Sequence, residues 1–130
     1  MKALTICQPY AHLIAIDEKR VENRSWPTRY RGPLAIHAGK SRKMLAPDIH
    51  ARYPDMVFGA VVAIAELIDC LPADEIEDRL HDQRYPFLKW QAQHIGGPWC
   101  WVLSDTQPLA EPDPCGGSLG LWNWTPRPQS

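Results

Sequence analysis

Residues 17–32, with the sequence DEKRVENRSWPTRYRG, belong to the densest group of polar side chains in this 130-residue chain. Residues 21–26 have the composition of an extended strand. Because side chains alternate between the two faces of a strand, Glu22, Arg24 and Trp26 are expected on one face. A carboxylate, a guanidinium and an aromatic ring would then lie together. Such a combination suits a nucleobase.

These charges have two interpretations. Charge runs most often mark solvated loops and the ends of strands. In the alternative interpretation, the polar group between residues 19 and 40 contributes to a binding site. An aromatic ring can stack on a base, Arg and Lys can hold a phosphate, and a carboxylate can accept the amino hydrogens of cytosine or adenine. The spacing of the residues leaves both interpretations open.

Short helices and strands are predicted on either side of this stretch. Apolar residues at i, i+3 and i+4 spacing indicate a short helix over residues 10–19, and a weaker helical pattern over 41–52 is interrupted by Pro47. An acidic helix is expected over residues 73–80. Further strands are predicted over residues 33–38, 57–71, 99–104 and 119–124. The second of these is the most apolar and is the expected central strand.

This order of elements predicts the fold class. About five strands and few helices follow one another without the regular alternation that a doubly wound parallel sheet needs. A small closed or nearly closed β-barrel with flanking short helices accommodates the pattern, in an α+β chain that is mainly β. A length of 130 residues suits a single domain over residues 1–130, with a frayed tail at 125–130.

Charge is distributed unevenly along the chain. Residues 1–53 carry ten Lys and Arg against four Asp and Glu, whereas residues 54–130 carry four against eleven, for a total of −1. One face could therefore be basic and attract nucleic acid, or the two parts could pair and cancel. The small total charge favours a small-molecule ligand over strong non-specific binding to a polymer.

The cysteines and histidines indicate which cellular compartment and which kind of metal site are expected. Cys7, Cys70, Cys100 and Cys115 lie far apart, with no CxxC pair, and no stretch resembles a signal peptide or a membrane span. We expect a reduced, cytoplasmic protein without membrane contact, either a monomer or a small homo-oligomer. The five histidines form no metal-binding spacing, so neither a metal nor another cofactor is expected.

The stretch KRVENR at residues 19–24, with the SWPTRYRG that follows it, resembles the GxKxxExR signature and following segment of ASCH domains. The resemblance covers nearly the whole chain. It extends to the segments ICQPY, IHAGK, GAVV, AEL, GPWCWVL and GLW, which lie at residues 6–10, 36–40, 59–62, 65–67, 97–103 and 120–122.

Two positions depart from the family's pattern. The leading glycine of the signature is Asp17 here. We expect Asp17 to accept a positive φ at some cost, because Asp is among the residues that tolerate this conformation. In the family members that hydrolyse N4-acylcytidines, the signature lysine works with a threonine three residues further on, where this chain has Glu22.

The resemblance implies a PUA-like β-barrel whose cleft holds the signature residues. Some members of the family bind RNA, one type cleaves single-stranded RNA, and a small bacterial type hydrolyses the amide of N4-acylcytidines with the signature lysine as a catalytic residue. Hydrolysis of N4-acetylcytidine-like nucleosides to cytidine and a carboxylic acid is therefore the leading prediction. RNA binding without catalysis and single-strand ribonuclease activity are the alternatives.

Four residues are candidates for catalysis. An amide hydrolase needs a base or nucleophile, a proton carrier and a group that stabilises the oxyanion. Lys19 would be the base or nucleophile if burial lowers its pKa. Glu22 or Glu66 would carry the proton, and Ser25, a tryptophan or a backbone N–H would hold the oxyanion. The competing interpretation is a simple salt bridge between Lys19 and Glu22 that closes a turn.

The candidates for substrate binding are Gln8, Pro9, Tyr10, Arg24, Trp26, His37 and Lys40. His37 lies on a predicted strand and is either a half-buried histidine whose hydrogen bonds the protein itself provides or a proton carrier near neutral pH. The tryptophans at positions 99, 101, 122 and 124 alternate in pairs along two predicted strands. They suit either a core or the wall of a cleft.

Overall fold

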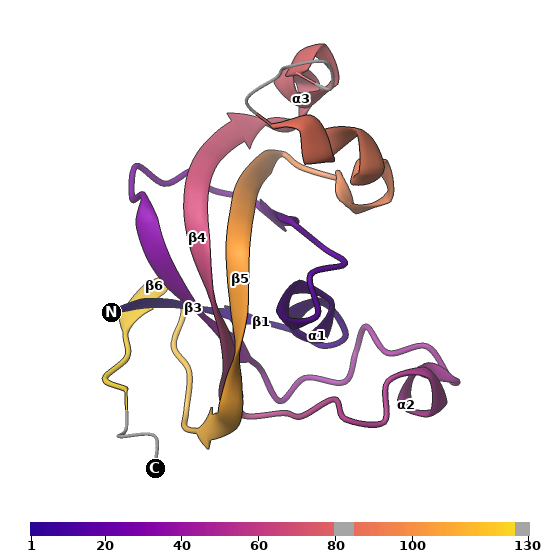
Figure 1. Ribbon diagram of the computed structural model, residues 1–130, viewed down its shortest axis with the longest axis vertical. Coiled ribbons are helices and arrows are strands. Elements are labelled where there is room, and N and C mark those ends of the chain that lie inside the picture. Colours follow the sequence, from indigo (N-terminus) through magenta and orange to yellow (C-terminus); the bar gives the residue numbers. More distant parts are fainter. Residues whose placement is uncertain (80–84, 127–130) are drawn as a thin grey trace. The chain divides into compact units, whose positions relative to one another are not determined.

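The computed structural model describes residues 1–79 and 85–126, and its secondary structure is mainly β (Figure 1). The strands are β1 (Lys2–Ile6), β2 (Val21–Arg24), β3 (Gly32–Ala38), β4 (Ala60–Pro72), β5 (Trp99–Pro114) and β6 (Leu121–Asn123). The helices are α1 (Tyr10–Ala15), α2 (Ile49–Arg52) and α3 (Ala73–Arg79), with 3₁₀ turns η1 (Pro86–Trp90) and η2 (Ala92–His94). Six strands within the described residues confirm the predicted class, an α+β chain that is mainly β.

The strands are hydrogen-bonded in the order β2-β5-β4-β3-β1-β6. β1 pairs in parallel with β3 and antiparallel with β6, and β2 pairs antiparallel with β5. β4 has a neighbour on each side, so the prediction of a central strand is confirmed. The strands predicted over residues 33–38, 57–71 and 119–124 are β3, β4 and β6, with small shifts of their ends.

The chain divides into two compact units, to which β4 and β5 both contribute. The first unit contains residues 1–18, 33–65 and those from 106 onward, and the second unit contains residues 19–32 and 66–105. The signature segment that begins at residue 19 therefore belongs to the second unit.

The core of the first unit is built around Ala3 on β1. Ala3 lies opposite Ala35 of β3, and both are buried together with Val61 and Trp124. Two alanines leave the room that a tryptophan ring needs in a close-packed core. The Nε1–H of Trp124 donates to Oδ2 of Asp113 at 2.8 Å, so its polar group is satisfied inside the core. Trp124 is thus a core residue.

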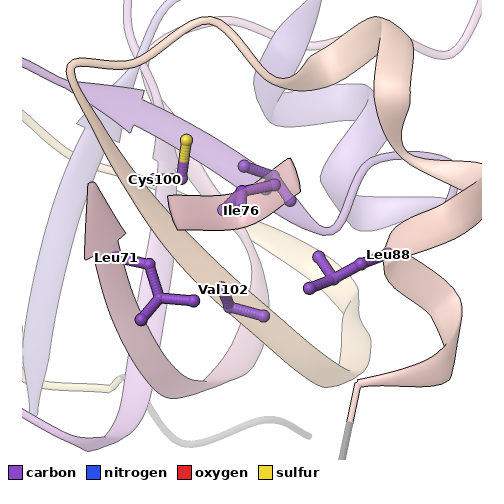
Figure 2. Packing of buried hydrophobic residues seen from close by; sticks show 6 residues of the cluster. Leu71, Ile76, Leu88, Cys100 and Val102 are labelled. Atoms are coloured by element: carbon purple, nitrogen blue, oxygen red, sulfur yellow. The ribbon is translucent and has the colours of Figure 1, made fainter. Parts of the chain in front are cut away.

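The core of the second unit holds β2 in place (Figure 2). Val21 of β2 lies opposite Val102 of β5. Burial of one such side chain stabilises the folded state by about 1.5–3 kcal/mol. The cluster gathers side chains from three strands, α3 and η1: Val21, Leu71, Ile76, Leu88, Cys100 and Val102. One face of β2 is therefore anchored in the core, and its other face is left for the polar side chains.

The helix predicted over residues 10–19 is shorter than expected, because α1 ends at a left-handed residue. Asp17 has a φ of 65°. Its N–H donates to the Ile14 carbonyl at 3.0 Å, and the Glu18 N–H donates to the Leu13 carbonyl at 2.9 Å. These bonds form a Schellman motif with an aspartate where glycine is usual. The expectation of a positive φ at Asp17 is confirmed.

The helical prediction for residues 41–52 is wrong for most of the segment. Helix α2 covers the last four residues, and residues 41–48 form turns and irregular chain. Pro47 lacks an N–H group and disfavours the helical conformation at the residue before it. The helix therefore begins only after this proline.

β5 is longer than the strand predicted over residues 99–104, because it continues to Pro114 through Pro108 and Pro112. Proline has no N–H to give to a sheet and is found mainly at sheet edges. β2 pairs with residues 99–102 of β5, and beyond them β5 keeps β4 as its neighbour. Pro108 and Pro112 come after the residues of β5 that pair with β2. On the side of β5 that β2 no longer covers, the backbone has no neighbouring strand among the described residues to which an N–H group would donate.

Two predictions reach the limits of the described residues. The acidic helix expected over residues 73–80 is α3, and residue 80 lies outside the described part of the chain. The tail expected at 125–130 lies for the most part outside it as well, since the description ends at residue 126. That the two units together form one domain stays a prediction.

Candidate active site

β2 presents the predicted polar residues on one face. Glu22 lies opposite Trp101 of β5, and Arg24 lies opposite Trp99. The Nε and Nη2 atoms of Arg24 donate to Oε2 of Glu22 at 3.1 and 2.8 Å. The expectation that Glu22 and Arg24 share a face is therefore confirmed.

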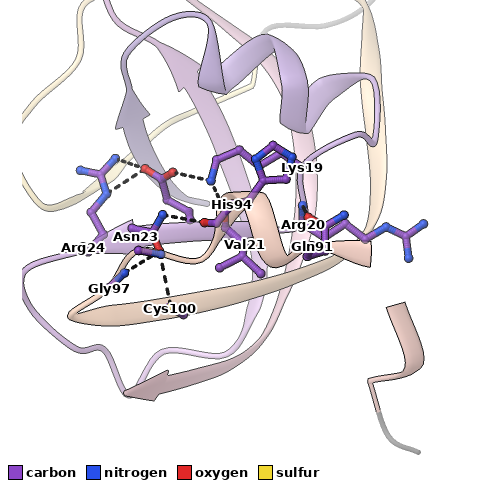
Figure 3. Close-up of polar contacts among 11 residues, drawn as sticks. Lys19, Arg20, Val21, Asn23, Arg24, Gln91, His94, Gly97 and Cys100 are labelled. Atoms are coloured by element: carbon purple, nitrogen blue, oxygen red, sulfur yellow. Dashed lines mark hydrogen bonds and ion pairs between the residues drawn. The ribbon is translucent and has the colours of Figure 1, made fainter. Parts of the chain in front are cut away.

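Lys19 adds a second cation to Glu22 (Figure 3). Lys19 is 2% exposed and Glu22 is 7% exposed. The Nζ of Lys19 lies 3.6 Å from Oε1 of Glu22 and also donates to the backbone carbonyl of Val21. Each oxygen of Glu22 therefore faces a different cation. The salt bridge of the simpler interpretation is present, and it is buried.

Burial lowers the pKa of Lys19 below its ordinary value of 10.5. The carboxylate of Glu22 opposes this shift, and the guanidinium of Arg24 adds to it. A lysine with a lowered pKa carries a larger fraction of neutral amine, the form that acts as a base or nucleophile. Lys19 thus has the pKa lowered by burial that a base or nucleophile at this position needs.

Trp26 packs edge-on against Trp101. The ring centroids lie 4.8 Å apart with the planes at 90°, and Nε1 of Trp101 donates to the backbone oxygen of Trp26 at 3.3 Å. Trp101 is fully buried, whereas Trp26 is half-buried. Trp101 is therefore a core residue that holds Trp26, and Trp26 keeps an accessible surface.

Asn23 fixes the opposite face of β2 and was not among the predicted residues. Its Oδ1 accepts the N–H groups of Gly96 and Gly97, both at 3.0 Å, and its Nδ2 donates to the His94 carbonyl at 2.8 Å (Figure 3). The thiol of Cys100 also lies 3.4 Å from Oδ1, and burial raises the pKa of this thiol. Asn23 ties the strand to the loop before β5, and its position within β2 is the only signal for it in the sequence.

The other catalytic candidates, Ser25 and Glu66, also lie in the second unit. Ser25 is exposed directly after β2, and Glu66 is half-buried on β4. Participation of these two residues in catalysis stays a prediction.

Gln8, Pro9 and Tyr10 lie at the start of α1 in the first unit. Gln8 is fully buried: its Nε2 donates to the Val57 carbonyl at 2.6 Å, and its Oε1 accepts the His12 N–H at 2.9 Å. The Gln8–Pro9 peptide is cis. The side chain of Gln8 thus joins α1 to the loop before β4. A role for this turn in substrate binding stays a prediction.

His37 is buried on β3, and the protein provides partners for both ring nitrogens. Its Nε2 lies 2.8 Å from the Cys115 carbonyl, and its Nδ1 lies 3.1 Å from the Thr5 hydroxyl. Because a carbonyl only accepts, we assign the proton to Nε2, so that Nδ1 accepts from Thr5. Thr5 in turn accepts from Nε1 of Trp122 at 3.1 Å. This chain of bonds favours the structural interpretation of His37, and its role in binding stays a prediction.

Lys40 opens an exposed basic segment, residues 40–52, of the first unit. Its stem covers Gly59, where an added Cβ would lie 2.9 Å from Cε of Lys40. The guanidinium of Arg42 lies over the ring of Phe58, 4.2 Å from the centroid, and 3.4 Å from the ring of His50. The segment joins cations and an aromatic ring on an exposed part of the first unit.

In residues 1–79 and 85–126, no three His, Cys, Asp or Glu side chains lie close enough together to hold a metal ion. No helix in this part of the chain is long and apolar enough to cross a membrane. The four cysteines are free thiols.

Comparison with known proteins gives a family and two relatives. The family model of the ASCH domain matches residues 4–112. Activating signal cointegrator 1 of Homo sapiens is 27% identical over 132 residues, which take 92% of this chain and 21% of that protein. The Mus musculus protein of the same name is 26% identical over the same shares. This chain therefore spans about a fifth of the length of these curated relatives.

Solved structures show the same fold. The crystal structure of an ASCH protein from Zymomonas mobilis superposes with a TM-score of 0.51 at 16% identity, over 87% of this chain and 72% of that one. A serine-to-alanine mutant of that protein gives the same values. The likeness confirms the PUA-like fold class that the sequence resemblance implied.

Proposed function

This chain belongs to the ASCH domain family, and from that premise we propose that its second unit hydrolyses the N4-amide of N4-acylated cytidines to cytidine and a carboxylic acid. The observation that supports the proposal best is the buried Lys19 amine, which lies 3.6 Å from Glu22. Burial lowers the pKa of this amine, as a catalytic base or nucleophile requires.

The proposed reaction uses Lys19 as a general base. Its neutral amine takes a proton from a water molecule, and the hydroxide adds to the acyl carbonyl carbon. A tetrahedral oxyanion forms and collapses as the bond between the acyl carbon and N4 breaks. The Lys19 ammonium gives its proton to N4 and returns to the neutral amine. The products are cytidine and a carboxylic acid, which loses its proton to water.

In this reaction Glu22 positions Lys19 and does not carry its proton. Both oxygens of Glu22 already face cations, Lys19 at 3.6 Å and Arg24 at 2.8 Å. Arg24 in turn holds the carboxylate in one orientation through two donors on the same oxygen. Glu66, the other carboxylate candidate in the unit, is therefore the group assigned to relay the proton that the Lys19 ammonium gives to N4.

Substrate recognition is assigned to the residues around this cluster. The accessible part of the Trp26 ring, braced by Trp101, suits stacking of a pyrimidine. Ser25 directly follows β2 and is exposed, so its hydroxyl is the assigned donor to the oxyanion. The remaining binding candidates, Gln8, Pro9, Tyr10, His37 and Lys40, belong to the first unit.

The test follows the ultraviolet absorbance of N4-acetylcytidine with purified protein and no added metal. Lys19→Met replaces the amine with an uncharged chain of similar length. We expect the wild type to form cytidine and Lys19→Met to lose about 10²-fold or more of the rate, the usual effect of a general base. Lys89→Met, at an exposed lysine of η1, is the matched control and should keep the rate.

Two outcomes would contradict the proposal. Unchanged turnover in folded Lys19→Met would remove Lys19 from the mechanism. Absence of cytidine with the wild type, for acetyl and for longer acyl groups, would overturn the activity itself.

A second candidate function, RNA binding without catalysis, is supported by the basic segment, residues 40–52. Exposed cations that lie beside the Phe58 ring can hold phosphates while a base stacks. Fluorescence anisotropy with single-stranded RNA at several salt concentrations tests this candidate. The logarithm of the binding constant should fall linearly with the logarithm of the salt concentration. Arg42→Ala should reduce both the affinity and the steepness of this salt dependence. A gel of the same RNA would reveal ribonuclease activity.

A further inference from the structure

Gln91 of the second unit is 6% exposed, and the proposed hydrolysis gives it no role. It lies between the 3₁₀ turns η1 and η2. Its N–H donates to the Leu88 carbonyl at 3.0 Å, and its carbonyl accepts the His94 N–H at 2.9 Å. Leu88 is itself fully buried in the core of the unit. The backbone of Gln91 is therefore anchored to that core.

The side chain of Gln91 fixes the backbone directly after Lys19 (Figure 3). Its Oε1 accepts the Arg20 N–H at 2.7 Å, across 71 residues of sequence. This N–H belongs to the peptide group that joins Lys19 to Arg20. The carbonyl of Arg20 accepts the N–H of Leu103 at 2.8 Å, from β5. The backbone that leads from Lys19 into β2 is thus bound by both Gln91 and β5.

The position of the Lys19 amine depends on this backbone. Nζ of Lys19 donates to the Val21 carbonyl and lies 3.6 Å from Oε1 of Glu22. Both partners belong to β2, so the side chain spans the peptide that Gln91 fixes. A rotation of that peptide would move Nζ relative to both partners. A displacement of about 1 Å can cost a catalytic group about 10²-fold in rate.

We propose that Gln91 is a positioning residue for Lys19 and acts through its hydrogen bond to the Arg20 N–H. In this role the amide fixes where the Lys19 amine lies relative to Glu22 and takes no part in the reaction itself. The effect of Gln91 on rate rests on the proposed hydrolysis, whereas its effect on the Lys19 amine is measurable without turnover.

Loss of this hydrogen bond should raise the pKa of Lys19. Burial is the largest cause that lowers this pKa, and burial depends on where the amine lies. The other groups that act on Lys19 are Glu22 and Cys100, which raise its pKa, and Arg24, which lowers it. Gln91 carries no charge, so its influence on the pKa comes through position. An amine released toward water should titrate closer to its ordinary value of 10.5.

Titration of Lys19 by NMR tests the proposal directly. Full chain with ¹³C-labelled lysine is titrated with base, and the Cε resonance that is missing from Lys19→Met identifies Lys19. Gln91→Met replaces the acceptor with an apolar side chain of similar length and should raise the pKa of Lys19. Gln93→Met, at an exposed glutamine of η2, is the control and should leave this pKa unchanged. The same pKa in the wild type and in folded Gln91→Met would overturn the proposal.

Gln91→Asn is the milder variant, and it decides the question if Gln91→Met does not fold. It keeps the amide, but the loss of one methylene group moves the oxygen away from the Arg20 N–H. The pKa of Lys19 should rise here as well, and the Arg20 amide proton should shift upfield as its hydrogen bond weakens. A Lys19 pKa that stays in place while the Arg20 resonance shifts would contradict the proposed link.

The rate of hydrolysis separates an effect through Lys19 from a general loss of structure. Gln91→Met should lower kcat about 10- to 100-fold and move the rising limb of the pH–rate profile to higher pH. Added to Lys19→Met, the same substitution should lower the rate no further, because the group on which it acts is already absent. A further loss in the double variant would show that Gln91 acts elsewhere and would overturn the proposal. A wild type without activity would contradict the hydrolysis alone, and the titration of Lys19 would still decide whether Gln91 positions the amine.

Discussion

Nζ of Lys19 and Oε1 of Glu22 lie 3.6 Å apart, and the two side chains are 3% and 9% exposed. A cation and an anion that share surroundings with little water depend on each other strongly, because removal of one leaves the other buried and unpaired. Arg24, on the far oxygen of Glu22, completes a row of alternating charges. The chemistry proposed for Lys19 therefore depends on the row as a whole.

Glu22→Gln should move the pH dependence of hydrolysis. The carboxylate raises the pKa of Lys19, so its loss leaves burial and Arg24, which both lower it. The rising limb of the pH–rate profile should shift to lower pH. The maximal rate should fall about 10- to 100-fold because the amine loses its positioning partner. Glu75→Gln, at an exposed glutamate of α3, should leave the profile in place. A limb that does not move would exclude Lys19 as the titrating group.

Lys19 should make folding stability depend on alkaline pH. The unfolded chain holds the Lys19 proton up to its ordinary pKa of 10.5, whereas the folded chain releases it at lower pH because of burial. Between these two pKa values the unfolded state binds more protons, so this contribution to stability rises with pH. The wild type should therefore gain stability relative to Lys19→Met across this window. Urea denaturation at a series of pH values measures the difference, and a constant difference would contradict the prediction.

Asp17→Gly should stabilise the fold. Asp17 holds a φ of 65° at the end of α1, a conformation that glycine adopts without a steric cost. We expect a gain of about 1 kcal/mol in the free energy of unfolding, the low end of the cost of a left-handed residue, because aspartate tolerates this conformation better than most residues. Asp17→Ala is the comparison and should lose stability, since alanine lacks the tolerance of aspartate for this conformation. The same midpoint for both variants in chemical denaturation would show that the backbone conformation is not what matters here.

Gly117→Ala should disturb the hydrogen bonds of His37. A Cβ at Gly117 would lie 2.3 Å from Oγ1 of Thr5 and 2.8 Å from the ring of His37, so something must move. We expect a loss of about 1–3 kcal/mol and a change in the His37 ring resonances. Gly116→Ala, where an added Cβ meets nothing within 4 Å, is the neighbouring control. Equal stability of the two variants would argue against tight packing over His37.

Local rules of the backbone made part of this structure predictable. Alternation along a strand placed Glu22 and Arg24 on one face without knowledge of their neighbours, because it follows from strand geometry alone. The positive φ of Asp17 could be anticipated in the same way, since a turn with its own hydrogen bonds sets it. For the strands predicted at residues 33–38 and 57–71, the amino-acid composition and the pattern of apolar residues both indicated a strand.

Long-range partners explain what could not be predicted. The acceptor of Asn23 serves Gly96, which lies 73 residues further along the chain, and nothing near Asn23 in the sequence marks that contact. The continuation of β5 through its prolines depends on where the neighbouring β2 ends. His37 is engaged by Cys115, 78 residues away, so its choice between a structural and a chemical role could not be decided locally.

The burial of Lys19 also limits what can reach it. A reagent that acylates amines reacts directly with exposed lysines such as Lys40 and Lys89, but it meets Lys19 only when the second unit opens locally. The rate at which Lys19 is labelled, relative to those two, therefore measures the free energy of that opening. In the proposed hydrolysis, the acyl group of a substrate must reach Lys19 through the same local opening. The free energy of that opening would therefore limit both the labelling rate and the turnover rate, and the size of the opening would determine which substrates reach Lys19.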